Sequence, residues 1–353
     1  MNTKPVDAIA NAVLYEGYML YPYRASSVKN RQRFNFGVLY PESYSAAQMG
    51  TDASSMQTEC LVEGGLLTTI EVKVRFLKVV ERLVRTLADP AGQPERTRGF
   101  EPLPVPEFAN EASASWQEAI ECEVAVPDCN LVALEATPVK WEFAFPAKEE
   151  SELSRDDNGR YQALVTRKQQ AVQGIVEVSA VRVVEDGLFK LRVRLINLTS
   201  FGVDDQATRD QALTVSLVSA HTLLGVVDGR FFSLLEPPES LNDLVQSCQN
   251  VGTWPVLIGA AGDRDTMLSS PIILYDYPQI APESPVNLFD GTEIDEILAL
   301  RILAMTDEEK REMRDTDDRA RRMLERTEAL PKESLMRLHG TLRELRALKE
   351  EMS

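Results

Sequence analysis

Residues 174–198 read GIVEVSAVRVVEDGLFKLRVRLINL and carry the clearest strand pattern in the chain. Two runs rich in β-branched and other apolar residues flank the turn signal Glu185-Asp186-Gly187, and this pattern predicts a β-hairpin. On the second run, apolar residues alternate with basic ones, as on a strand with one buried and one solvated face. The apolar residues are Phe189, Leu191, Val193 and Leu195, and the basic ones are Lys190, Arg192 and Arg194. We interpret the basic side as the solvated face of a sheet.

Strand patterns continue on both sides of this hairpin. Residues 70–76 alternate between apolar and charged, and the apolar run at 76–84 either continues this strand or turns helical. Further strands are expected at residues 120–126, 139–145 and 255–259, with an extended segment at 270–278. Residues 45–58 are small and polar and predict a loop, whereas residues 212–227 fit either a buried strand or a buried helix.

The C-terminal part of the chain changes character. Thr292 with Asp295, and Thr306 with Glu309, have the spacing of helix capping boxes. Pro331 suits the first turn of a third helix. That helix carries a narrow apolar stripe at helical spacing, formed by Leu335, Leu338, Leu342 and Leu345.

These patterns together predict an α+β protein. Its body, at residues 1–285, is expected to be β-rich, mostly antiparallel and sandwich-like. The body includes a tyrosine-rich N-terminal segment and an irregular proline-rich connection near residues 89–115. A charged helical tail at residues 286–353 follows it.

Charge and composition exclude several classes of partner. The 353 residues contain 55 acidic and 38 basic side chains, which give a net charge of −17. Such a chain is expected to repel nucleic acid and anionic lipid except at a local basic patch. No stretch approaches the roughly 18 apolar residues of a membrane helix, and the N-terminus lacks a secretion signal. We therefore expect a cytoplasmic protein with reduced thiols, no nucleic-acid partner and no integral membrane segment.

Catalytic signatures are missing from the sequence. It contains no G-x-x-x-x-G-K-[ST], G-x-G-x-x-G, G-x-S-x-G, H-E-x-x-H or C-x-x-C motif. Of its two histidines, His221 lies in an apolar stretch and is interpreted as a hydrogen-bonded core residue, and His339 as a surface residue. We expect no catalytic residue and no cofactor, so that a non-enzymatic role is favoured.

Two further groups of residues contain side chains of the types that bind metal ions. The thiols are Cys60, Cys122, Cys129 and Cys248, and the acidic group is Asp290, Glu293, Asp295 and Glu296. The thiols are widely spaced and are interpreted as buried and inert; a metal or cluster site would need their sulfurs within a few ångströms of one another. The acidic residues are expected to cap a helix N-terminus rather than to hold a cation. We therefore expect no metal site.

A basic, tyrosine-rich segment stands out against the acidic background. Residues 17–41 contain four basic side chains and no acidic one. Tyrosine and arginine are the residues that often supply binding hot spots between proteins. The candidate docking residues are Tyr18, Tyr21, Arg24, Arg31 and Arg33. The alternative is that the tyrosines cover the edge of a sheet.

Four stretches of the chain carry a resemblance to a known family. They are LYEGY and YPYR within residues 14–31, NVGTWPVL at 250–257, LSSPIILYDYP at 268–278, and FDGTEIDEIL at 289–298. In these stretches the chain resembles uncharacterised accessory proteins encoded beside actinobacterial-type high-affinity nickel–iron uptake hydrogenases. The resemblance implies an accessory role in the assembly, maturation or stabilisation of the hydrogenase, with a hydrogenase subunit or another accessory protein as partner.

The resemblance transfers no catalytic residue. The scarcity of histidine and cysteine argues against nickel delivery by this chain. The alternative function is an enzyme or a small-ligand-binding protein of unrecognised type, which would use a cleft between the body and the tail.

Overall fold

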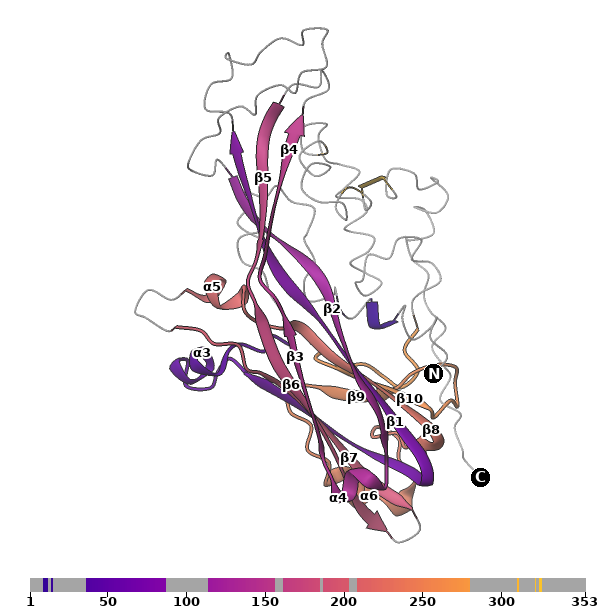
Figure 1. Ribbon diagram of the computed structural model, residues 1–353. Coiled ribbons are helices and arrows are strands. Elements are labelled where there is room, and N and C mark those ends of the chain that lie inside the picture. The colour runs from indigo at the N-terminus through magenta and orange to yellow at the C-terminus, as the bar shows by residue number, and fades with distance from the viewer. Residues whose placement is uncertain are drawn as a thin grey trace. The chain divides into compact units, whose positions relative to one another are not determined.

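The computed structural model describes residues 9–11, 14, 36–86, 114–155, 161–184, 187–202, 208–279, 310, 321 and 324–325. The chain divides into two compact units, one made of residues 1–18 and 34–278 and the other of residues 19–33 and 279–353. Nearly all of the described residues belong to the first unit, whose strands are labelled in Figure 1. The predicted helical tail and most of the proline-rich connection lie outside the described residues, and they stay predictions together with the boundary near residue 285.

One strand, β1 (Ser55–Thr86), organises the first unit and is 32 residues long. This length is unusual, because most strands have about five or six residues. The apolar run at residues 76–84 is therefore strand and not helix. The strands that pair antiparallel with β1 are β2 (Ala114–Asn130), β5 (Tyr161–Gln169), β7 (Leu188–Asn197) and β8 (Val218–Phe231).

The sheet forms two layers because β1 bends. Between Gly64 and Thr69 its register with β8 shifts, and the strand turns back there (Figure 1). The first layer has the order β3 (Val139–Phe145), β6 (Val172–Val184), β7 and the first part of β1. The second layer contains β2, the rest of β1, β8, β10 (Thr266–Ser270) and β9 (Trp254–Leu257). Because all the described strand pairs are antiparallel, the prediction of a β-rich, mostly antiparallel body is confirmed.

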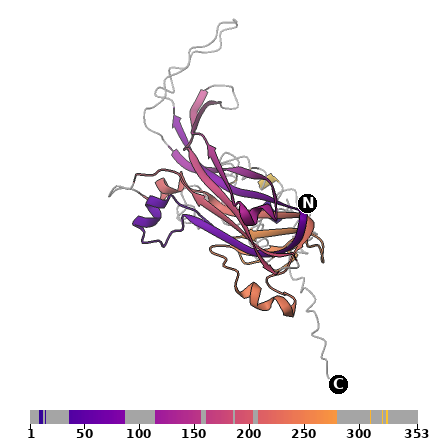
Figure 2. The same ribbon diagram turned by 60° about the horizontal axis from the view of Figure 1, so that its bottom comes forward.

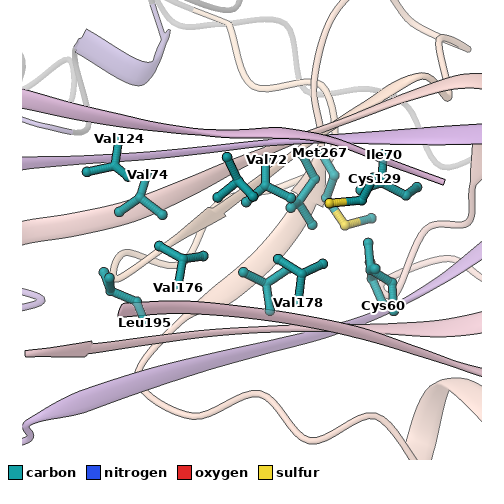
Figure 3. Packing of buried hydrophobic residues seen from close by; sticks show 14 of the residues in the cluster. Cys60, Ile70, Val72, Val74, Val124, Cys129, Val176, Val178, Leu195 and Met267 are labelled. Atoms are coloured by element: carbon teal, nitrogen blue, oxygen red, sulfur yellow. The ribbon is translucent and has the colours of Figure 1, made fainter. Parts of the chain in front are cut away.

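The main core lies between the two layers. Alternate residues of β1 point into it on both sides of the bend, namely Met56, Cys60 and Val62 before it and Ile70, Val72, Val74 and Phe76 after it. Figure 3 shows Val74 and Val124 of the second layer facing Val176 and Leu195 of the first. Burial of apolar surface stabilises a fold by roughly 25 cal/mol per Å². The contact between these side chains therefore holds the layers together.

The far end of β1 projects beyond the core together with β4 and β5 (Figures 1 and 2). β3 and β4 (Lys148–Arg155) run antiparallel to β6 and β5, so that the four strands form one long hairpin. Its β3–β6 part belongs to the first layer, whereas β5 pairs with the end of β1 in the second. The hairpin therefore connects the two layers at the end of β1 that is remote from the bend.

Short helices lie in the connections of the first unit. They are α3 (Glu42–Ala47), α4 (Ala133–Ala136), α5 (Arg209–Leu213), the 3-10 helix η1 (Glu239–Leu241) and α6 (Asn242–Gln246). The loop prediction for residues 45–58 is wrong in part, because α3 ends and β1 begins within it. The apolar stretch at 212–227 contains the end of α5 and most of β8. None of the helices in the described part of the chain has the length and apolar character needed to cross a membrane.

The bend in β1 is fixed by hydrogen bonds to its backbone. The Gly64 amide donates to the carbonyl of Gly187 at 2.9 Å. The buried Thr68 hydroxyl accepts from the Gly65 amide at 2.8 Å and donates to the carbonyl of Asp228 at 2.6 Å. A Cβ atom on Gly64 would lie 2.5 Å from Oγ1 of Thr68, so the threonine would have to move. This bend therefore requires glycine at position 64.

We predict that Gly64→Ala lowers the free energy of unfolding by about 2 kcal/mol, because the added methyl group displaces the buried Thr68 side chain. Gly65→Ala is the matched control, because a Cβ at position 65 meets no atom within 4 Å. It should change the stability by less than about 0.5 kcal/mol. Urea denaturation of both variants measures the difference, and equal effects at the two positions would contradict this account of the bend.

Candidate functional site

The docking residues predicted from the sequence lie outside the described residues. They are Tyr18, Tyr21, Arg24, Arg31 and Arg33. The same holds for His339 and for the acidic group at residues 290–296. The docking hypothesis for the N-terminal segment and the capping hypothesis for the acidic group therefore stay predictions. The cleft between body and tail, which the alternative function requires, also involves residues outside the described part.

All four cysteines are free thiols. Burial raises the pKa of Cys122 and of Cys248 to about 11, and it also raises the pKa of Cys60 and Cys129. These thiols are therefore protonated near neutral pH, and a protonated thiol is a poor nucleophile. Within the described ranges, no three His, Cys, Asp or Glu side chains are grouped so that they could hold a metal ion.

His221 is fully buried on β8. Its Nδ1 atom lies 3.0 Å from the carbonyl oxygen of Ser219. Burial lowers the pKa of His221 to about 4, and nearby Arg75 adds to this effect. The imidazole is therefore neutral near pH 7, with Nδ1–H donating to Ser219, and among the described residues its Nε2 atom has no hydrogen-bond partner. This arrangement agrees with the interpretation of His221 as a hydrogen-bonded core residue.

The basic side of β7 is largely solvated, in agreement with the interpretation of the hairpin, but two of its cations also contact a buried carboxylate. Arg192 lies opposite Glu59 of β1, and its Nε atom is 2.6 Å from Glu59 Oε1. The Nζ atom of Lys190 is 3.7 Å from Glu59 Oε2. The Glu59 side chain is only 1% exposed, and a carboxylate so deeply buried must be paired with cations or hydrogen-bond donors. These two basic residues supply part of that pairing.

Residues 249–251 complete the surroundings of Glu59. The Gln249 amide donates to Glu59 Oε2 at 2.8 Å. The Asn250 side chain accepts from the Glu59 amide at 2.8 Å and donates to its carbonyl at 3.2 Å, so it takes the place of a neighbouring strand. Gln57 and Val251 exchange two backbone hydrogen bonds beside this contact. The segment that leads into β9 is therefore attached to the edge of β1.

A buried trio of hydroxyl groups reinforces this attachment. The Ser269 hydroxyl lies 2.6 Å from that of Thr58 and 2.7 Å from that of Thr253, and all three residues are buried. Thr253 and Ser269 belong to two of the stretches on which the family resemblance rests. In this chain those stretches therefore connect β9 and β10 to β1, which is a structural role.

Lys78 is a buried cation that the sequence analysis did not identify. Its Nζ atom donates to the carbonyl of Pro146 at 3.0 Å, and the residue is only 1% exposed. Burial lowers the pKa of Lys78, an effect that nearby Cys122 partly offsets. Because Pro146 lies between β3 and β4, the lysine ties the long hairpin to β1. It lies out of reach of a large substrate or a docking protein.

An exposed apolar pair follows β10 and is the most prominent candidate for a binding function. Ile272 and Leu274 pack onto the outer side of the second layer, against the cluster that contains Leu268. The alternate residues Ile273 and Tyr275 face solvent and are 73% and 86% exposed. We call these two residues the Ile273–Tyr275 pair. The sequence indicated an extended segment here, but an unbroken apolar run does not show which side chains are exposed.

The backbone that carries this pair is held in place on its C-terminal side. The carboxylate of Asp276 accepts hydrogen bonds from the Leu257 amide, at 2.8 Å, and from the Ser233 hydroxyl. The Tyr277 amide donates to the carbonyl of Leu257 at 2.7 Å, and its hydroxyl donates to the carbonyl of Asp263 at 2.9 Å. A partner would therefore meet two exposed apolar side chains on a backbone that is already ordered.

We predict that His221 makes the fold sensitive to acid. Its pKa is about 4 in the folded chain and is expected near 6.5 in the unfolded chain. As the pH falls from 6.5 to 4, the unfolded state takes up a proton that the folded state refuses, so stability is lost in this window. The difference corresponds to about 3 kcal/mol. In His221→Gln, the fall in the free energy of unfolding over this window should be smaller by that amount.

Urea denaturation at several pH values measures the effect, with His339→Gln as the control for loss of a histidine elsewhere in the chain. The control should show the same pH dependence as the wild type. An unchanged pH dependence in His221→Gln would contradict the burial of a neutral imidazole.

The chain was also compared with known proteins. No family model matches it, and the search of curated proteins found no match.

Proposed function

We propose that this chain is a non-enzymatic accessory or scaffold protein for the assembly, maturation or stabilisation of a nickel–iron hydrogenase. It acts in the cytoplasm through protein–protein contacts. The observation that carries the proposal is the Ile273–Tyr275 pair, an exposed apolar feature on an ordered backbone. The hydrogenase is proposed as the partner because of the family resemblance.

The energetics of binding support a role for this pair. Tyrosine is enriched among the residues that contribute most of the affinity at protein interfaces, and burial of an aliphatic neighbour adds apolar contact area. Binding costs less conformational entropy when the backbone is already ordered. Ile273 and Tyr275 contribute little to the packing of their own chain, because most of each side chain is exposed to solvent. Their exposure is therefore better explained by a partner than by the stability of the fold.

The chemistry of the described groups also favours binding over catalysis. The raised pKa values of Cys122 and Cys248 keep these thiols protonated. His221 is neutral and fully buried, and Lys78 is enclosed with its ammonium group on a backbone carbonyl. Catalysis requires such groups to reach a substrate. Each of them instead packs within the fold.

Two parts of the proposal rest on the sequence. The basic segment with Tyr18, Tyr21, Arg24, Arg31 and Arg33 would give further contacts with the partner. The helical tail at residues 286–353 would do the same through its leucine stripe. Both would extend the surface around which a hydrogenase subunit or another accessory protein is assembled.

The proposal predicts that the purified chain binds a nickel–iron hydrogenase, or one of its subunits, from the same organism. The double variant Ile273→Ser/Tyr275→Ser should weaken the affinity by about tenfold or more, because two hot-spot side chains are lost. Isothermal titration calorimetry measures the affinity. Met49→Ser is the matched control, because Met49 is 93% exposed and lies far along the chain, near α3.

The control should bind as the wild type does. Absence of wild-type binding to the hydrogenase and its subunits, together with normal hydrogenase activity in a deletion strain, would refute the proposed function. Equal affinity of the wild type and the double variant would instead leave the function standing and exclude the Ile273–Tyr275 pair as a contact.

A further inference from the structure

A second exposed apolar feature lies at the bend of β1. Leu66 and Leu67 are adjacent, and each is 79% exposed. We call these two residues the leucine tip. Val227, which pairs with Thr69 beside the bend, is also exposed. Single exposed leucines are common on protein surfaces, but two adjacent leucines next to an exposed valine form an apolar patch.

The leucine tip is a built feature of the fold. The register of β1 against β8 passes from Gly64 directly to Thr69, so residues 65–68 bulge out of the strand pair. The Asn130 side chain donates to the carbonyl of Leu66 at 2.7 Å. The hydroxyl of Thr68 and the carbonyl of Gly187 hold the glycines that precede the tip. Bulges in strands often re-aim side chains next to functional sites, and this one aims two leucines at solvent.

The backbone at the bend does not require leucine at these two positions. Residues 64–68 form their hydrogen bonds through their own backbone atoms and the Thr68 side chain, and none of the described core clusters includes Leu66 or Leu67. Polar residues at the same positions would keep all of these bonds and would be better solvated. The apolar side chains therefore point to a role outside the stability of the chain.

The charged residues around the leucine tip indicate which kind of surface it can bind. Asp228 lies in the strand opposite the bulge, and Asp128 lies two residues before Asn130; both are exposed. Neither has an ion pair with another described residue, whereas nearby Glu63 is paired with Arg230 at 2.8 Å. The surroundings are thus acidic. Acidic surroundings repel an anionic membrane, and they also repel the same surface of a second copy.

We infer that the leucine tip inserts into an apolar pocket of a partner protein, and that basic side chains on the rim of this pocket face Asp128 and Asp228. The tip supplies apolar contact area on a backbone that is already ordered, and the two carboxylates supply orientation. This surface is distinct from the Ile273–Tyr275 pair, and the inference does not depend on the identity of the partner.

Site-specific photocrosslinking in the source organism tests the inference. A diazirine amino acid is placed at position 67 of the full chain, and the adducts are identified by mass spectrometry. We expect one discrete protein adduct. Its yield should fall by about tenfold in a chain that also carries Leu66→Ser, because half of the apolar contact is lost. It should fall severalfold with Asp128→Asn/Asp228→Asn, and it should persist with Tyr275→Ser as the control.

Each result decides the matter. A protein adduct that depends on Leu66 and on the two aspartates supports the inference. If that protein is a hydrogenase subunit, the proposed function gains support; if it is an unrelated protein, the leucine tip is still a docking site and the proposed function loses support. A lipid adduct, an adduct with a second copy of the chain, an adduct insensitive to Leu66→Ser, or no adduct overturns the inference. An unchanged unfolding midpoint of Leu66→Ser shows that the loss is not due to misfolding.

Discussion

One strand, β1, runs through both layers and sets the geometry of each. β1 pairs with four other strands, so the registers of those strands are all defined relative to one another. A slip of one residue in β1 would exchange core and solvent positions in both layers at once. The bend at Gly64 sets the two parts of β1 face to face, and the buried Thr68 side chain fixes that geometry. The same bend exposes Leu66 and Leu67, which form the leucine tip.

The parts of the fold that could be predicted from the sequence are those whose pattern is local. The sequence predicts the hairpin of β6 and β7 and the strand β3, because apolar residues alternate along them or flank a turn signal. The sequence does not predict β4, because KEESELSR has no apolar face. β4 is an edge strand that pairs only with β5 among the described strands, and both of its faces are largely exposed. Where no face of a strand is buried, periodicity carries no signal.

The candidate surfaces were harder to predict, because they depend on contacts between distant segments. Glu59 and Arg192 are 133 residues apart, and only the pairing of β1 with β7 brings them together. The alternation of Lys190 and Arg192 with apolar residues was detected correctly, but the buried carboxylate opposite them was not. In the same way, the sequence shows four large apolar residues at 272–275, and the packing decides that Ile273 and Tyr275 are the exposed ones. The sequence pattern shows where such segments lie, and the tertiary contacts determine which of their side chains are buried and which are exposed.

The net charge of −17 also bears on how the exposed apolar residues interact with other protein molecules. A protein that displays Leu66, Leu67 and Tyr275 on an ordered backbone risks association with its own copies. Repulsion between like-charged molecules opposes that association, and it is strongest where acidic residues lie beside the apolar patch, as Asp228 does beside the leucine tip. A partner with basic residues around an apolar pocket would meet attraction in place of repulsion. The acidic character, from which we expect no nucleic-acid partner, would in the folded chain also favour proteins with complementary charge.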